Sequence, residues 1–301
     1  MPVLPSGIVQ IDTLLGGIPG AAASYLVEGD APAVVDTGAQ TSAEVLAAAL
    51  AARGLGPEDL AWIILTHVHL DHCGGTGDLA RAFPRARIVV HPRGARHLVA
   101  PDRLVEATRA VFGGLDLLGG LEAVEEARIV PADDGVRIAI GPGRDLVALH
   151  APGHARHHLV VLDEATGVVM AGDALGVRLP GARLYPAVPP PEFDLDAARA
   201  TLARLRALDP AALLLGHFGD VGDPAAALTE SERLQTLAAG AAARAWRRFG
   251  TVAAVDRAVR AIVPPEPHLG GALATMRRLG WVGNNAVGLA RWAQAQAEGA
   301  L

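Results

Sequence analysis

Short blocks of hydrophobic residues, separated by turn residues, dominate the first 40 positions of the chain. Apolar runs of about four to eight residues bounded by Gly, Pro, Asp or Ser are typical of buried β-strands. The pattern therefore predicts strands at 7–15, 23–28 and 33–36. The same criterion predicts further strands at 61–66, at 86–90, in several pieces between 127 and 171, and at 211–215. The chain thus carries an early and a late group of strands.

Between these strands, apolar residues recur at the spacing of amphipathic helices. Residues 41–53 also follow a candidate cap, Thr41 or Ser42, and carry Glu44 in the first turn, where an acidic side chain is favourable. Helices are predicted at 41–53, 76–83, 101–112 and 194–208. This order of strands and helices fits a layered α/β sandwich better than a strictly alternating, doubly wound sheet.

The character of the chain changes near residue 220. Residues 223–248 predict one long helix, and further helical stretches follow, divided by prolines at 264–265 and glycines at 270–271. We therefore predict two parts, a domain of residues 1–220 and a helical C-terminal extension of residues 221–301.

Composition narrows the class of protein. Hydrophobic residues make up 51% of the chain, which is enough for a sizeable core, and the net charge is −6. The acidic balance, with no dense run of arginine, argues against a nucleic-acid partner. A single cysteine, Cys73, excludes an internal disulfide. The first residues lack the pattern of a signal peptide, and no apolar stretch is long enough to span a membrane, so we expect a cytoplasmic protein.

The strongest chemical signal directly follows the predicted strand at 61–66. Residues 66–72 read Thr-His-Val-His-Leu-Asp-His. In an extended loop, His67 and His69 point the same way, because side chains alternate along such a backbone. Imidazole and carboxylate groups are the ligands that zinc and similar ions take. We therefore predict a metal site here; the alternative is a chance cluster of surface histidines.

The run His67-Val68-His69-Leu70-Asp71-His72 resembles the HxHxDH motif of the metallo-β-lactamase superfamily. Four further segments resemble motifs of that family in the same order, namely Val35-Asp36-Thr37-Gly38, Ala151-Pro152-Gly153-His154, Ala171-Gly172-Asp173 and Leu215-Gly216-His217. The resemblance spans about residues 20–218. It implies a metallo-β-lactamase αββα sandwich over the predicted domain of residues 1–220, with the site along one edge where loops leave the two sheets.

The resemblance also implies a site for two divalent metal ions. By this analogy, one ion is held by His67, His69 and His154, the second by Asp71, His72 and His217, and Asp173 bridges both. Zinc is the expected metal, and manganese or iron would also fit such ligands. Two ions would activate a water molecule, so no Ser or Cys nucleophile is needed, and Asp71 is the implied proton shuttle and catalytic residue.

Several neighbouring residues receive other roles. Asp36 is expected to hydrogen-bond the 67–71 loop and orient the ligands rather than bind metal. Cys73 is expected to pack, because small residues suit that position. One of His157 and His158 is expected to line the site, since side chains alternate along an extended segment. The Pro-rich stretch 186–191 is predicted to be a loop near the site.

The implied activity is hydrolysis of an ester, thioester or lactone bond in a small molecule. Two positions differ from known branches of the family. Residues 155–158 read Ala-Arg-His-His, unlike the Thr-x-Gly run of glyoxalase II, and Gly176 stands where quorum-quenching lactonases carry a tyrosine, although Tyr185 follows in the next loop. The alternatives are a mononuclear iron oxidoreductase resembling persulfide dioxygenases, and a non-catalytic metal-binding scaffold.

The C-terminal extension has no candidate catalytic residues of its own. Its recurrent apolar positions, such as Trp246 and Trp281, need a surface to cover. We expect the extension either to pack on the sandwich alone, or to shape the substrate pocket or a homodimer interface.

Overall fold

The computed structural model describes residues 3–4, 6–262, 274–275 and 277–299 and contains two six-stranded sheets. The first sheet has the order β1-β2-β3-β4-β5-β6 and the second β12-β11-β10-β9-β8-β7. The strands of the first sheet are β1 Val9–Asp12, β2 Ala23–Val27, β3 Ala33–Val35, β4 Trp62–Ile64, β5 Arg87–Val90 and β6 Ile129–Pro131. Those of the second are β7 Val136–Gly141, β8 Arg144–His150, β9 Leu159–Asp163, β10 Val168–Gly172, β11 Ala212–Leu215 and β12 Gly219–Asp220.

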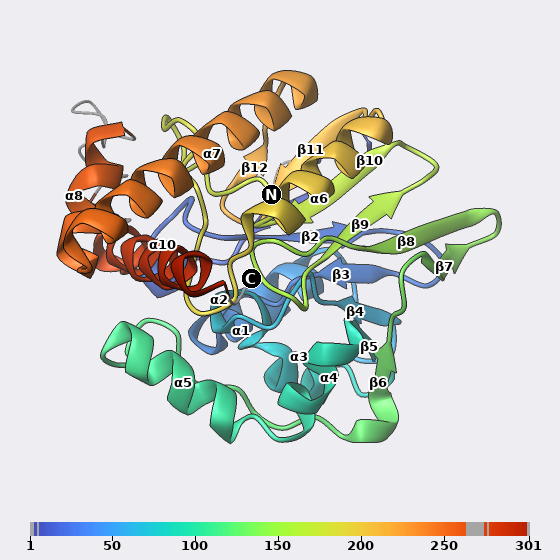
Figure 1. Ribbon diagram of the computed structural model, residues 1–301. Coiled ribbons are helices and arrows are strands. Elements are labelled where there is room, and N and C mark those ends of the chain that lie inside the picture. The colour runs from blue at the N-terminus through green and yellow to red at the C-terminus, as the bar shows by residue number, and fades with distance from the viewer. Residues whose placement is uncertain (1–2, 5, 263–273, 276, 300–301) are drawn as a thin grey trace.

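Helices cover both outer faces of this pair of sheets (Figure 1). On the side of the first sheet lie α1 Ala43–Ala52, α2 Leu70–Cys73, α3 Thr76–Ala82, α4 Pro92–Val99 and α5 Asp102–Phe112. On the side of the second lie α6 Leu195–Ala207, α7 Pro224–Phe249, α8 Val252–Ile262 and α10 Trp281–Glu298. Short 3-10 turns occur at Leu15–Gly17, Gln40–Ser42 and Glu126–Arg128.

Side-chain alternation along the strands separates the hydrophobic cores. In β4, Ile63 packs between the first sheet and its helices, whereas the next residue, Ile64, packs between the two sheets. In β9, Val160 packs towards the helices of the second sheet and Val161 packs between the sheets. Each sheet is therefore apolar on both faces, which is why it is covered on both sides and the molecule has four layers, αββα.

The α/β sandwich predicted from the sequence is confirmed. The predicted helix at 101–112 corresponds to α5 and that at 194–208 to α6, each within one residue of the predicted bounds. Helix α4 was missed because its arginine- and histidine-rich stretch has few apolar positions. Two start signals could have revealed it: Pro92 occupies the first turn, and the His91 side chain accepts a hydrogen bond from the N–H of Arg93.

The C-terminal helices pack against α6 and against one another. Buried residues of α6, α7, α8 and α10 share one apolar cluster, which includes Ala198, Ala238, Val255 and Leu289. The predicted breaks at 264–265 and 270–271 lie outside the described residues, and a domain boundary near residue 220 stays a prediction. Among the described helices, none combines the length and apolar character that crossing a membrane requires.

Candidate metal centre

Loops that leave one end of the two sheets carry all seven predicted ligands. In the first sheet, His67 and His69 follow β4, and α2 then carries Asp71 and His72. In the second sheet, His154 follows β8, Asp173 follows β10 and His217 follows β11. Strands β8 and β10 both run antiparallel to β9, and β10 is parallel to β11, so these three strands end on the same side. Residues up to 150 positions apart in the chain therefore converge at one edge.

The backbone around the histidine run combines an extended part with a tight turn. His69 is extended, with φ −74° and ψ 145°, and α2 begins at the next residue. Gly74 follows α2, and a Cβ at this position would lie 2.4 Å from the carbonyl oxygen of Leu70 and 2.7 Å from the amide nitrogen of Gln40. Glycine is thus required for the turn that places Asp71 and His72 beside the two preceding histidines.

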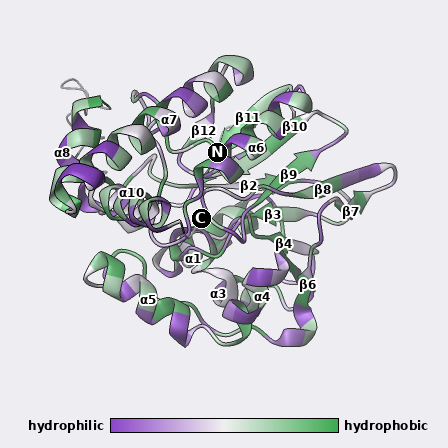
Figure 2. Cartoon of the chain, viewed as in Figure 1, coloured by the Kyte–Doolittle hydropathy of each residue, from purple (hydrophilic) through white to green (hydrophobic). Residues whose placement is uncertain are grey.

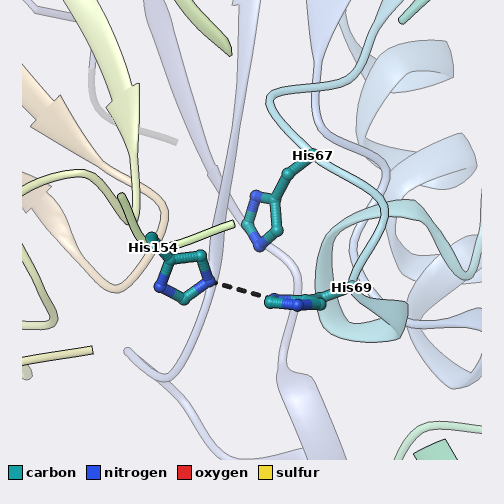
Figure 3. Close-up of side chains that lie close together, drawn as sticks. All are labelled: His67, His69 and His154. Atoms are coloured by element: carbon teal, nitrogen blue, oxygen red, sulfur yellow. Dashed lines mark hydrogen bonds between the residues drawn. The ribbon is translucent and has the colours of Figure 1, made fainter. Parts of the chain in front are cut away.

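The donor atoms form two groups, joined by a third that contains His67, His72 and Asp173 (Figure 3 shows the first). The first contains His67, His69 and His154, and the second contains Asp71, His72 and His217; within each group the donor atoms lie within 4.8 Å of one another. Asp173 reaches both groups. Its Oδ2 is 3.7 Å from Nε2 of His154, and its Oδ1 is 3.5 Å from Nε2 of His72 and 3.8 Å from Nε2 of His217.

Backbone carbonyls fix the orientation of two of the histidines. Nδ1–H of His154 donates to the carbonyl oxygen of Ala187 at 2.9 Å, and Nδ1–H of His217 donates to that of Ala21 at 2.7 Å. A neutral imidazole that donates through Nδ1 keeps a lone pair on Nε2. Both Nε2 atoms therefore face the centre as acceptors.

Asp36 and Thr66 fix two further rings. Asp36 accepts hydrogen bonds from the N–H of Thr66 at 2.7 Å and from Nδ1–H of His72 at 2.9 Å. The Thr66 hydroxyl donates to Asp36 at 2.8 Å, so its oxygen is left to accept from Nδ1–H of His67 at 3.0 Å. Asp36 was expected to hydrogen-bond the 67–71 loop itself. It instead contacts Thr66 and His72, the residues on either side of that loop. No role was predicted for Thr66, although its place between the strand and the first histidine was a usable signal.

The resulting lone pairs suit a cation. Nε2 of His72 lies 3.0 Å from Nε2 of His217, and Nε2 of His154 lies 3.0 Å from Nδ1 of His69. In the first pair, neutral rings with these tautomers would present two acceptors to each other, so the contact requires positive charge between the nitrogens. Nε2 of His67 and Oδ1 of Asp173 are, in addition, buried without a hydrogen-bond partner among the described residues. Buried polar atoms without partners are costly, and a metal ion would satisfy them.

The electrostatics of the site favour the protonation states of metal ligands at His67, His69 and Asp173, but favour a proton on His72. Burial and the neighbouring histidines lower the pKa of His67 well below its usual value, and they lower that of His69 to about 3. Burial alone would raise the pKa of Asp173, but His72 and His217 outweigh it and hold that pKa well below the usual range. Burial lowers the pKa of His72, but Asp173 and Asp36 outweigh it and raise that pKa well above normal. Metal ions would compete with the proton that His72 otherwise attracts.

The neighbouring residues behave differently from the ligands. Cys73 is fully buried in the core between the first sheet and its helices, as the packing prediction required. His157 lines the cavity beside the centre. His158 is fully buried, and its Nε2 accepts the backbone N–H of Asp173 at 3.1 Å, a positioning contact that the sequence did not reveal. Tyr185 is not among the residues that line this cavity.

A cavity of about 330 Å³ opens beside the candidate centre. His69, Asp71, His154 and Asp173 contribute to its wall, so four of the seven candidate ligands face it. The C-terminal extension also contributes: the ring of Trp281, at the start of α10, lies 4.5 Å from that of His217, centroid to centroid. The extension therefore forms part of the pocket wall, as one of the two predictions for it required.

Helix α10 also holds the loop that orients His154. Oδ1 of Asn285 accepts the N–H of Val188 at 2.9 Å, and its Nδ2 donates to the carbonyl oxygen of Pro186 at 2.5 Å. These two backbone groups flank Ala187, whose carbonyl receives Nδ1–H of His154. Asn285 is buried, so both of its hydrogen bonds lie away from solvent. The C-terminal extension thus reaches a candidate ligand through one intermediate loop.

Substitution of Gly153 is expected to test how tightly the His154 loop is packed. Gly153 has φ +139°, and a Cβ there would lie 2.4 Å from Cα of Ala198 in α6. Gly153→Ala should lower the free energy of unfolding by about 3 kcal/mol or more, since it adds a backbone clash to the strain. Gly135→Ala is the control, because Gly135 has φ +85° but open space around it, and it should cost only about 1 kcal/mol. Equal costs in urea unfolding would contradict the packing argument.

Comparison with known proteins points to one family. The model of the "Metallo-beta-lactamase superfamily" matches residues 17–217. A metallo-beta-lactamase fold-containing protein of Sulfurisphaera tokodaii is 29% identical over 167 residues, which cover 54% of this chain and 62% of that protein. A hydroxyacylglutathione hydrolase of Xanthomonas campestris is 31% identical over 141 residues, covering 46% of this chain and 42% of the relative. An N-acyl homoserine lactonase of Bacillus cereus is 28% identical over 154 residues, covering 51% and 52%. The chain thus spans less than two thirds of each of these relatives.

Solved structures show the same fold over most of the chain. An archaeal metallo-beta-lactamase superfamily protein from Sulfolobus tokodaii superposes with a TM-score of 0.72 at 22% identity, covering 94% of this chain and 97% of the other. A family protein from Thermus thermophilus superposes with a TM-score of 0.64 at 23% identity, covering 92% and 89%. In both cases the likeness extends beyond the first 220 residues to the C-terminal helices.

Proposed function

Because the chain belongs to the metallo-β-lactamase superfamily, a family of metal-dependent hydrolases, we propose that it holds two divalent metal ions and hydrolyses an ester, thioester or lactone bond in a small molecule. The observation that carries the proposal is the convergence of two donor groups on Asp173. Under the proposal, His67, His69 and His154 hold one ion, Asp71, His72 and His217 hold the other, and Asp173 contacts both. Zinc is the favoured metal, with manganese or iron as alternatives.

Bound divalent ions would lower the pKa of water and polarise the substrate's carbonyl oxygen. The chain's own residues set the conditions for that chemistry. Asp36, Thr66 and the carbonyls of Ala21 and Ala187 keep four of the five imidazoles in the tautomer that presents a lone pair to the centre, namely those of His67, His72, His154 and His217. Under the proposal, Asp71, which lines the cavity, takes up a proton from water and releases it to the leaving group.

The two alternatives considered from the sequence, an iron oxidoreductase and a non-catalytic metal-binding scaffold, have less support. A mononuclear iron oxidoreductase needs only the first donor group, yet the second group is equally complete and buried. A non-catalytic scaffold needs no access to its metal, yet the cavity opens onto candidate ligands of both groups. Hydrolysis with two ions uses both the second donor group and the cavity that gives a substrate access to the ligands.

Elemental analysis of the purified protein is expected to give two metal ions per chain after reconstitution with zinc. Each donor group supplies three side chains before Asp173 is counted, which is a sufficient set for one ion. A panel of ester, thioester, lactone and phosphodiester substrates should then identify the bond that is cleaved. A stoichiometry that stays at one ion after full reconstitution would contradict the two-metal proposal. Loss of activity on treatment with a chelator, reversed by adding zinc, is the matching functional result.

A further inference from the structure

One wall of the cavity is the apolar face of α5. Leu104, Ala107, Thr108 and Val111 line the cavity and recur at helical spacing along this helix. No residue of α5 is fully buried; Leu104 packs against the apolar cluster of the first sheet, and the rest of this face borders the cavity. Figure 2 shows hydrophobic residues along the helix, and Figure 1 shows that it stands apart from the sheets. A cavity lined mainly by apolar side chains, with a few polar groups at defined places, is typical of a site for a partly apolar ligand.

Other apolar side chains extend this wall towards the far end of α5. Phe112, the last residue of the helix, lines the cavity together with Leu118 and Trp281. A Cβ at Gly280 would lie 3.4 Å from the Phe112 ring, so the end of α5 meets the start of α10 here. The loop of residues 186–191 adds four prolines to the lining. An aliphatic or aromatic group placed here would lose most of its contact with water.

The opposite end of α5 is cationic. Arg96 at the end of α4 and Arg103 in the first turn of α5 both line the cavity. Neither forms an ion pair with an acidic side chain in the part of the chain that the structure describes, whereas Arg109 on the outer side of α5 pairs with Glu106. Arg103 and Val111 are separated by about 12 Å along the helix, since each residue advances it by about 1.5 Å. The cationic end is therefore well separated from the far end of the apolar wall, where Val111, Phe112 and Trp281 lie.

One acidic residue, Glu192, lines the cationic end as well. Its carboxylate already accepts the backbone N–H of Arg156 at 3.2 Å and lies 3.7 Å from Nε2 of His157. Burial and the charge of Arg96 hold the pKa of the neighbouring His97 below its usual value, so that ring adds no charge. This end of the cavity therefore has two guanidinium groups, from Arg96 and Arg103, and one carboxylate, from Glu192, which already has other partners. The resulting net positive charge suits an anionic group.

We propose that the substrate is an amphiphilic acyl ester or thioester, with an apolar acyl chain along α5 and Trp281 and with a carboxylate or phosphate on its alcohol or thiol part bound by Arg96 and Arg103. This inference rests on the proposed function. In the reaction, water adds its oxygen to the carbonyl carbon, the carbon–oxygen or carbon–sulfur bond breaks, and one proton passes to the leaving group. The products are an apolar carboxylic acid and an anionic alcohol or thiol, and no further reactant is required.

Binding of uncleaved amide analogues tests the anionic subsite apart from hydrolysis. Isothermal titration of the zinc-loaded protein would compare N-decanoyl-β-alanine with the neutral N-decanoyl-3-aminopropanol. The anion is expected to bind about tenfold more tightly, as two partly exposed charge pairs should give. The double variant Arg96→Gln/Arg103→Gln should lose this preference, and Arg109→Gln should keep it. Equal affinity for the two analogues, or a preference that survives the double variant, would overturn the assignment of the arginines. N-decanoyl-phosphoethanolamine in the same assay shows whether carboxylate or phosphate is preferred.

Chain length tests the apolar wall. N-acetyl-β-alanine keeps the anionic group but lacks most of the acyl chain, so it is expected to bind at least about a hundredfold more weakly than N-decanoyl-β-alanine. Equal affinities would remove the α5 wall from the proposal. Because binding is measured without cleavage, the result separates the two proposals. Tight binding of the amphiphile, by a protein that cleaves no ester or thioester, would defeat the proposed function and leave the binding site standing.

Discussion

Asp173→Ala is expected to lower kcat/KM of the proposed hydrolysis by about a thousandfold or more and to reduce the metal content from the proposed two ions towards one. The two carboxylate oxygens of Asp173 face different donor groups, Oδ1 towards His72 and His217 and Oδ2 towards His154. Removing the side chain would leave the two groups without a shared ligand. Initial rates and elemental analysis of the same preparation measure both effects.

Cys73→Ala is the matched control for this substitution. Cys73 lies two residues from Asp71 but points into the apolar core and is fully buried there. We expect it to cost about 1 kcal/mol of stability and to leave the metal content unchanged. Asp173→Asn keeps the volume of the side chain and removes its charge, so it serves if the alanine variant folds poorly. Comparable activity in the Asp173 and Cys73 variants would rule out the bridging assignment.

Asn285→Ala is expected to weaken zinc affinity by about 10- to 100-fold, although Asn285 is not a proposed ligand. Its side chain holds the backbone on both sides of Ala187, and Ala187 orients His154. Without the amide, the N–H of Val188 and the carbonyl of Pro186 lose their partners, and the loop can shift. Competition against a chromogenic chelator measures the affinity directly.

The neighbouring residue provides the control for Asn285. Asn284 lines the same cavity from the same helix, but its Nδ2 has no hydrogen-bond partner in the described part of the chain. Asn284→Ala should therefore leave zinc affinity within about twofold of the starting protein, since no ligand-orienting hydrogen bond is removed. Thermal unfolding of both metal-free variants shows how much of any change is general destabilisation. Equal zinc affinities in the two variants would disprove the role of Asn285.

The sequence was informative wherever a feature depends on nearby residues. The buried strands were predicted because runs such as Trp62-Ile63-Ile64-Leu65 are apolar on both faces. The predicted strand at 61–66 is nevertheless longer than β4, which ends at Ile64. At Thr66 the backbone N–H turns to the carboxylate of Asp36 instead of continuing the sheet. Such a contact between distant segments has no local signal.

At the candidate site too, features with a local sequence signal were predicted, and contacts between distant segments were not. Its seven candidate ligands followed from the resemblance to the motifs of the family, and the structure brings all seven together, while their role as ligands stays a prediction. Three supporting contacts were not predicted. Thr66 orients His67, His158 holds the backbone of Asp173, and Asn285 holds the loop beside His154. Each is an ordinary polar residue in an ordinary setting until the fold brings its partner close, and for Asn285 the partner is 97 residues away.

The proposed ligands come from both sheets and from positions between 67 and 217. A pair of ions held there would cross-link segments far apart in the chain, much as disulfides do, and would restrict the unfolded chain if any ligands stayed attached. Ions that bind only the folded protein shift the unfolding equilibrium by mass action, by about 2.7 kcal/mol at a free concentration one hundred times the dissociation constant. The melting temperature should therefore depend on the concentration of free zinc. The metal centre would therefore stabilise the folded protein by linking its two sheets, in addition to its proposed role in catalysis.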